Sequence, residues 1–279
     1  MARIKRVAAL QDLSCFGRCS LAVVLPVLSA MGVQGCPMPT AVLSSHTGGF
    51  GTVARTELAD QLQGTLEHWR RLGLDFDGVY TGYLSSPRQA GLARRAVETL
   101  RRAGGVALVD PVLGDGGRLY ASVTPELAAA MGELCQAADV ITPNLTEAAV
   151  LLGRPAEQVL EDPLTLVRLL SAGGRRSVVL TGVEPEPGKI GAAWFDREGG
   201  RTGLCAQARA PGHYPGTGDL FAAVLAGSLT RGERLETGVA RAVDFVSRCA
   251  RHTARLGTPD REGVAFEPLL AGLADSPVG

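Results

Sequence analysis

Gly216-Thr217-Gly218-Asp219 runs directly into Leu220-Phe221-Ala222-Ala223-Val224-Leu225-Ala226, an apolar stretch that predicts a helix. The glycines lack a Cβ, so the backbone can bend sharply and come close to a ligand. The first amides of a helix have no intrahelical partner, and with the helix dipole they form an anion site. Asp219 beside an incoming anion is unfavourable unless its carboxylate has a chemical role. The stretch therefore predicts the phosphoryl-transfer centre of a small-molecule kinase, with the amides on the phosphate and Asp219 as the base.

An ordinary helix start is the alternative interpretation of this stretch. Thr217 can be an N-cap, and acidic residues are common in the first turn of a helix. Taken alone, the four residues slightly favour this alternative. The positions of the other polar residues along the chain decide between the two interpretations.

The composition predicts a single domain over residues 1–279. The chain has 46% hydrophobic residues, and no linker rich in proline, serine or charge divides it. Its 28 basic and 28 acidic residues balance, which argues against nucleic acid or an acidic membrane as the main partner. Six cysteines without a CxxC pair indicate reduced thiols in a cytoplasmic protein. No signal peptide is visible, and the apolar stretch near 21–33 is too short to span a bilayer.

Strands and helices are predicted to alternate along the chain. The predicted strands are 6–13, 34–43, 77–83, 106–109, 139–142 and 177–180, followed by a hairpin of 191–195 and 204–208. The predicted helices are 20–31 (capped by Ser20), 56–72, 87–103, 125–135, 147–152, 164–172, the helix after Gly216, and 233–255. This alternation predicts an α/β fold in which a mostly parallel sheet is covered on both faces.

Polar residues follow nearly every predicted strand. In parallel sheets, ligands bind beyond the carboxyl ends of the strands, so these side chains are expected to share one pocket. The residues are Asp12, Ser14, His46, Thr47, Tyr83, Asp110, Asn144, Thr181 and the stretch 216–219.

Two of these strand ends offer oxygen ligands of the kind that Mg²⁺ prefers. The stretch 110–115 carries two carboxylates around a glycine turn, and 142–147 carries an amide and a third carboxylate. Turn chemistry is the alternative explanation for Asp110 and Asp115, and a capping box from Asn144 is the alternative for Glu147. Other enzyme classes find no support, because GxxxxGK[ST], HExxH, GxSxG and a GxGxxG after the first strand are all missing.

The chain resembles the ribokinase-like family in its Gly216-Thr217-Gly218-Asp219 stretch. Three further stretches resemble the pyridoxal kinase branch of that family: Ser45-His46-Thr47-Gly48-Gly49-Phe50, Asp110-Pro111-Val112-Leu113-Gly114-Asp115, and Ile141-Thr142-Pro143-Asn144 with Glu147. Thr81-Gly82-Tyr83 also fits, and the resemblance covers about residues 6–255. It implies a three-layer α/β/α domain, usually dimeric, that transfers the γ-phosphate of ATP to a hydroxymethyl group.

The resemblance also implies a role for each matched position. Asp219 is the base toward the pyridine 5′-hydroxyl, and the amides of Gly216, Thr217, Gly218 and Asp219 stabilise the phosphate. Nucleotide contacts are implied for Asp110, Asn144, Thr181, Gly182 and Thr217, and a metal site for Asp115, Thr142 and Glu147. Thr47 and Tyr83 are implied to hold the ring. A monovalent cation is compatible with the family but is not indicated by any residue.

One stretch departs from the pyridoxal kinase pattern. Where a serine commonly follows the first strand, this chain has Asp12-Leu13-Ser14, which is also similar to hydroxymethylpyrimidine kinases. Asp12 and Ser14 are therefore expected at the substrate, with the ring left open between pyridine and pyrimidine. The third alternative is a non-catalytic vitamin B6 binder, against which the complete set of carboxylates argues.

Overall fold

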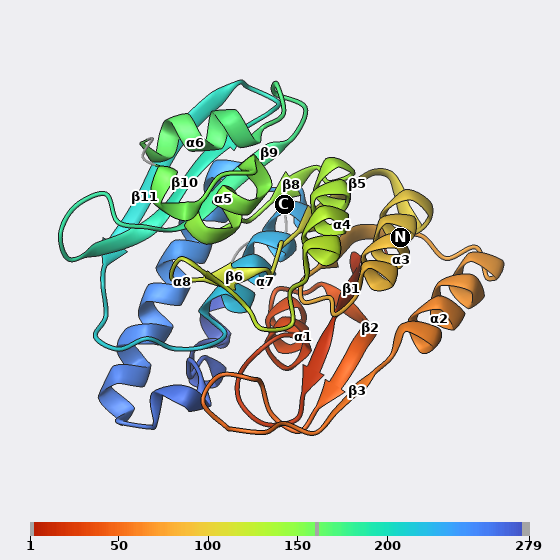
Figure 1. Cartoon of the computed structure of the whole chain (residues 1–279), viewed down its shortest axis with the longest axis horizontal. Coiled ribbons are helices and arrows are strands. Elements are labelled where there is room, and N and C mark those ends of the chain that lie inside the picture. The colour runs from red at the N-terminus through yellow and green to blue at the C-terminus, as the bar shows by residue number, and fades with distance from the viewer. Residues whose placement is uncertain (1–2, 160–161, 275–279) are drawn as a thin grey trace.

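The computed structural model describes residues 3–159 and 162–274 and is built around one nine-stranded sheet (Figure 1). The strand order is β11-β10-β9-β8-β5-β4-β1-β2-β3. The strands are β1 (Arg6–Ser14), β2 (Gln34–Leu43), β3 (Arg55–Glu57), β4 (Phe76–Thr81), β5 (Arg101–Val109), β8 (Val140–Ile141), β9 (Ser177–Val183), β10 (Lys189–Asp196) and β11 (Arg201–Ala208). The six strands from β2 to β9 pair in parallel, and β3, β10 and β11 pair antiparallel at the two edges.

Helices cover both faces of this sheet and complete a three-layer α/β/α fold. One hydrophobic cluster joins the sheet to α1 (Leu21–Ala30), α7 (Thr217–Arg231) and α8 (Leu235–Leu256). A second cluster joins the other face to α2 (Ala59–Arg71), α3 (Pro87–Leu100), α4 (Pro125–Gln136), α5 (Leu145–Leu152) and α6 (Pro163–Leu170). The predicted α/β sandwich is confirmed.

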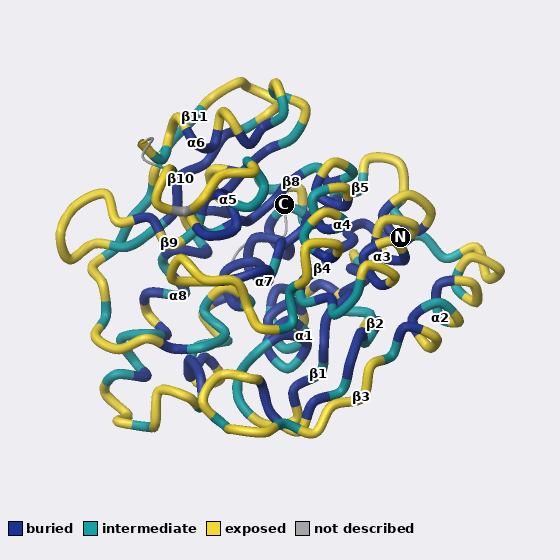
Figure 2. Tube along the Cα trace, in the orientation of Figure 1, coloured by how far each residue is buried: buried dark blue, intermediate teal, exposed yellow. Residues whose placement is uncertain are grey.

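The burial pattern explains why the strands contain few polar residues before their ends. All six residues of β4 are buried, as expected for a parallel strand covered on both faces. Helix α7 is buried along most of its length and is dark blue in Figure 2. No helix within the described residues is long and apolar enough to cross a membrane.

Two predicted helices have different boundaries in the structure. The helix predicted at 56–72 begins only at Ala59, because residues 55–57 form β3 and pair with the end of β2. The helix predicted at 87–103 ends at Leu100, because Arg101 already pairs with Phe76 of β4. In both places, pairing with a strand far away in sequence overrides a locally helical pattern.

A small hairpin was not predicted from the sequence. Strands β6 (Gly114–Asp115) and β7 (Arg118–Leu119) form a two-stranded sheet after β5. Gly114 is required there, because a Cβ at this position would lie 2.3 Å from the carbonyl oxygen of Arg118. The hairpin places residues 114–120 beside the carboxyl ends of the central strands.

Candidate active site

The glycine-flanked stretch forms the N-terminus of α7 and is open. Gly216 has φ 81°, and a Cβ there would lie 1.8 Å from the carbonyl oxygen of Arg18. Gly218 is exposed, with no heavy atom within 4 Å of an added Cβ. The first intrahelical bond runs from Leu220 N to Gly216 O at 2.9 Å, so the preceding N–H groups lack helix partners. Thr217 is not the N-cap, because its hydroxyl donates to Tyr214 O at 3.1 Å.

Asp219 is half-buried in the first turn of α7, and its environment suits a base. Burial and the neighbouring charge of Asp12 raise the pKa of Asp219 to about 7, against the lowering effect of the Ser20 backbone N–H. A general base is most effective when its pKa lies near the working pH. A phosphate can reach this bend only if the bend is accessible, and Gly218 is exposed while Gly216 is half-buried.

A second group of carboxylates lies around the end of β5. Thr142 donates its hydroxyl to Asp110 Oδ1 at 3.1 Å, and both residues are buried. Burial and the charge of Asp219 raise the pKa of Asp110 to about 7. Glu147 is 4% exposed, and burial and the charge of Asp110 raise its pKa well above the ordinary value. The charge of Asp219 acts on Asp110 and that of Asp110 acts on Glu147, which places the end of β5 near the starts of α5 and α7.

Glu147 also has the structural role that the sequence left open. It closes a capping box with Asn144, because its Oε2 accepts from Asn144 N at 2.9 Å and its own N–H donates to Asn144 Oδ1 at 3.0 Å. Its Oε1 accepts from Leu113 N at 3.0 Å. Both carboxylate oxygens are therefore bound by backbone amides, which fixes the loop carrying Asp110 to the start of α5.

The predicted nucleotide side is continuous with this group. Asn144 donates from Nδ2 to Gly114 O at 2.8 Å, and Thr181 donates from its backbone to Pro143 O at 2.9 Å. Gly182 follows in a left-handed conformation with φ 70° and is exposed. Asp115 lies in the exposed β6–β7 hairpin, where its Oδ1 accepts from Gly116 N at 2.8 Å.

Asp12 and Ser14 form a buried pair on the other side of Asp219. Ser14 donates to Asp12 Oδ2 at 2.9 Å and Ser20 donates to Oδ1 at 2.5 Å, while burial raises the pKa of Asp12. Ser20 is at the N-cap position of α1, as predicted. The predicted capping hydrogen bond is wrong, because the Ser20 hydroxyl donates to Asp12 and makes no bond to α1. His46 lies nearby, and its Nδ1 accepts from Gly48 N at 3.0 Å.

The two predicted ring contacts lie at the rim and are less tightly held. Thr47 is exposed and follows the buried His46. Tyr83 is half-buried, with its hydroxyl 3.4 Å from Ser122 Oγ and the guanidinium of Arg55 5.9 Å from its ring centre. No hydrogen bond between either side chain and the Asp12 pair is present.

Three residues near the centre were missed by sequence reasoning. Tyr80 and Gln11 are fully buried. Burial and the charges of Asp110 and Asp219 raise the pKa of Tyr80 well above its ordinary value, while the neighbouring polar side chain of Gln11 lowers it. Tyr120, just after β7, is 42% exposed, and partial desolvation together with the surrounding carboxylates raises its pKa. Tyr80 lies inside a strand and reads as core, so only strand order could have pointed to it.

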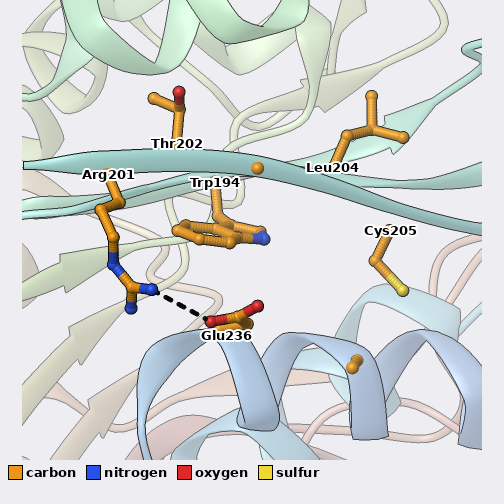
Figure 3. A pocket seen from close by; sticks show the side chains of 8 residues that line it. Trp194, Arg201, Thr202, Leu204, Cys205 and Glu236 are labelled. Atoms are coloured by element: carbon orange, nitrogen blue, oxygen red, sulfur yellow. Dashed lines mark ion pairs between the residues drawn. The ribbon is translucent and has the colours of Figure 1, made fainter.

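A cavity of about 600 Å³ lies elsewhere (Figure 3). It is formed between β11 and the first turns of α8, with the Trp194 indole beside it and an ion pair of 3.5 Å between Arg201 and Glu236. These residues are separate from the carboxylates at the strand ends. Site chemistry, and not cavity size, therefore identifies the candidate active site.

The site offers a magnesium ion uncompensated negative charge, but not a preformed set of ligands. Within residues 3–159 and 162–274, no three His, Cys, Asp or Glu side chains converge to hold a metal on their own. Asp110 binds Thr142 through Oδ1 only and is destabilised as an anion by its neighbours. Magnesium retains waters and commonly takes only one or two carboxylates besides phosphate oxygens. The residues present are compatible with that mode of binding.

Known proteins resemble this chain over nearly its whole length. The phosphomethylpyrimidine kinase family model matches residues 25–263. A crystal structure of a Bacteroides thetaiotaomicron protein described as a phosphomethylpyrimidine kinase, in a form with pyridoxal, is 40% identical, with TM-score 0.91 over 99% of this chain and 97% of that one. The pyridoxal kinase of Lactobacillus plantarum is 40% identical, with TM-score 0.90 and 97% of both chains covered. A pyridoxine/pyridoxal/pyridoxamine kinase of Bordetella bronchiseptica is 29% identical over 95% of this chain and 93% of its own.

The chain therefore belongs to the phosphomethylpyrimidine kinase family of ribokinase-like enzymes. Within that family, its relatives place it with the pyridoxal kinases, and it is a kinase. The resemblance inferred from the sequence motifs is confirmed.

Proposed function

We propose that this enzyme uses ATP to phosphorylate the 5′-hydroxymethyl group of pyridoxal, pyridoxine and pyridoxamine. The observation that carries the proposal is the Asp219 carboxylate, whose pKa is raised to about 7 and which lies beside the open N-terminus of α7. The similarity to vitamin B6 kinases over nearly the whole chain supports the choice of substrate.

The proposed reaction is an in-line transfer in which the chain supplies a base and an anion site. Asp219 accepts the proton of the 5′-hydroxyl while the oxygen of that hydroxyl attacks the γ-phosphorus. The bond between the γ-phosphorus and the β,γ-bridging oxygen breaks, and ADP leaves. The N–H groups of Gly216, Thr217 and Gly218 stabilise the negative charge of the transferring phosphoryl group. Because Gly218 is exposed and Gly216 is in a left-handed bend, a phosphate can approach these amides closely.

The nucleotide is proposed to lie along Asp110, Asn144, Thr181, Gly182 and Thr217. Magnesium, when bound, neutralises phosphate charge and polarises the γ-phosphate for attack. Asp115, Thr142 and Glu147 are the proposed metal-side residues. Because amides bind both oxygens of Glu147, this carboxylate is proposed to act mainly by its charge and by ordering the loop of Asp110.

The ring is proposed to be held between Thr47, Tyr83 and the Asp12–Ser14 pair. Asp12 and Ser14 lie beside the base, and Thr47 follows the buried His46, so these residues border the same end of the sheet. We also propose that the enzyme is a homodimer and is located in the cytoplasm. Light scattering of the purified protein is the first test of the homodimer.

The test is direct phosphorylation. Purified enzyme is incubated with MgATP and each of the three vitamers, and the 5′-phosphates are quantified by chromatography. Replacing Mg²⁺ with chelator should abolish product, and added K⁺ or Na⁺ will show any need for a monovalent cation. Absence of product from all three vitamers would overturn the proposal, and binding without turnover would instead indicate a vitamin B6 binder.

Hydroxymethylpyrimidine is the second candidate substrate. It is favoured by the description of the matching family and by Asp12-Leu13-Ser14 at the end of β1. Specificity constants measured side by side separate the candidates. We expect kcat/KM for at least one vitamer to exceed that for the pyrimidine.

A further inference from the structure

Ser20 has a backbone conformation that non-glycine residues rarely adopt. Its φ is 53° and its ψ is −133°, although an N-cap normally has extended backbone. Ala172, with φ 54°, is the other non-glycine residue with positive φ in the described part of the chain. Ala172 follows Ser171, the C-cap of α6, and so lies at a position where left-handed residues are common. Ser20 precedes a helix, so its conformation has no such local explanation.

Contacts on both sides hold Ser20 in this conformation. Its hydroxyl donates to Asp12 Oδ1 at 2.5 Å, and its carbonyl oxygen accepts from Val23 N and Val24 N, both at 2.9 Å. Ser20 is 5% exposed and Asp12 is 4% exposed, so water does not replace these bonds. Ser14 holds the other oxygen of Asp12 at 2.9 Å and thereby fixes the acceptor.

The conformation directs the Ser20 backbone toward the base. Burial and the charge of Asp12 raise the pKa of Asp219, and the neighbouring Ser20 N–H lowers it. Two residues earlier, Arg18 O lies so close to Gly216 that a Cβ on Gly216 would be 1.8 Å from it. The segment 18–20 therefore contacts both the phosphate-binding turn and the carboxylate that follows it.

We propose that Ser20 is a positioning residue for phosphoryl transfer, and that its strained backbone, anchored on Asp12, orients the Asp219 carboxylate. This inference rests on the proposed function, since it assigns the partner of the proposed base. Asp12 then acts through Ser20, in addition to bordering the ring. The essential group is the backbone N–H, and the hydroxyl matters because it keeps a Cβ-bearing residue in a glycine-like conformation.

Two substitutions at Ser20 test this order of causes. Ser20→Ala keeps the Cβ but loses the anchor, so the backbone can relax; we expect kcat to fall by about 10- to 100-fold while KM for ATP stays within about twofold. Ser20→Gly also lacks the hydroxyl, but glycine adopts the conformation freely, so kcat should fall by only about threefold. Ala172→Gly is the matched control, because it removes a positive-φ side chain away from the site and should leave kcat unchanged.

Equal losses in Ser20→Ala and Ser20→Gly would overturn the proposal, because the hydroxyl itself would then be the active feature. Wild-type kcat in Ser20→Ala would overturn it as well. Thermal unfolding and ADP binding check that each variant is folded. If Ser20→Ala does not fold, Asp12→Asn in the wild-type and Ser20→Gly backgrounds replaces it: a loss in wild type that is much smaller in Ser20→Gly supports the anchor, and equal losses overturn it.

The two proposals fail in distinguishable ways. Wild-type enzyme that phosphorylates no vitamer would overturn the proposed function. Wild-type turnover that Ser20→Ala retains in full would overturn only the role of Ser20.

Discussion

The two ends of the central sheet differ in the partners that they give to carboxylates: arginine side chains at the amino ends, and hydroxyl or amide groups at the carboxyl ends. At the amino ends, Asp77 is 4% exposed and pairs with Arg102 at 2.8 Å, and Asp139 pairs with both Arg101 and Arg197. At the carboxyl ends, Asp110 and Asp219 have hydroxyl or amide partners, and no ion pair within the described residues includes either of them.

The difference separates carboxylates that stabilise the fold through arginine pairs from carboxylates that are proposed to take part in the reaction. A buried carboxylate with an arginine partner keeps its charge and links strands. A buried carboxylate without one is destabilised as an anion, which is why the pKa of Asp110 and that of Asp219 rise to about 7. Strongly shifted pKa values of this kind are typical of functional sites.

Removing the base should have the largest effect. In Asp219→Asn the side chain keeps its shape but cannot accept the proton, so we expect kcat to fall by about 10³-fold. ADP affinity should change little, because the amides of α7 remain. Kinetics with pyridoxal and calorimetry with ADP measure the two quantities, and turnover near that of wild type would refute the assignment.

The pH dependence should follow the raised pKa of Asp219. The base works as the carboxylate, so its protonation below about pH 7 should lower kcat/KM by about tenfold per pH unit, with a plateau above. Because Asp110 titrates in the same range and faces Asp219, the profile reports both groups together. The rate is measured from about pH 5.5 to 9. A profile that is flat across pH 7 would contradict the proposed environment of the base.

The arginine-paired end should respond in stability and not in activity. In Asp77→Asn the side chain no longer balances Arg102, and its contact with Arg6 N at 3.0 Å is weakened. We expect the free energy of unfolding to fall by about 2 kcal/mol. Urea denaturation measures this loss, and kcat at a temperature where the variant is folded should equal that of wild type. A large loss of kcat in the folded variant would break the contrast between the two ends.

The fold and the candidate site residues at the strand ends could be predicted from the sequence, because their signals are local. Buried parallel strands and amphipathic helices leave their own periodicity, and strand ends mark where Asp110, Asn144 and Thr181 must gather. The edge strand β3 and the early start of β5 were inaccessible, because their hydrogen-bond partners at Ala41 and Phe76 are distant in sequence.

The missed residues depend on geometry that sequence patterns do not carry. Tyr80 and Gln11 occupy strand positions that look like core, and only the order of β1 beside β4 brings them below the site. Ser20 fits an N-cap by residue type, whereas its positive φ and its hydrogen bond to Asp12, at the end of β1, leave no local signal in the sequence.

The smallest expected effect is a gain in stability at the carboxyl ends. Burial and Asp219 raise the pKa of Asp110 in the folded state to about 7 from 3.8, so its contribution to stability is fully present below pH 3.8 and is lost as the pH rises to 7. Asp110→Asn keeps an acceptor for Thr142 without this loss, so at pH 8 the ligand-free variant should be about 1 kcal/mol more stable than wild type. Urea denaturation at pH 5 and pH 8 measures the difference, which should shrink at the lower pH. A variant less stable than wild type at pH 8 would mean that the ionised Asp110 is compensated after all, and the contrast between the two ends of the sheet would not hold.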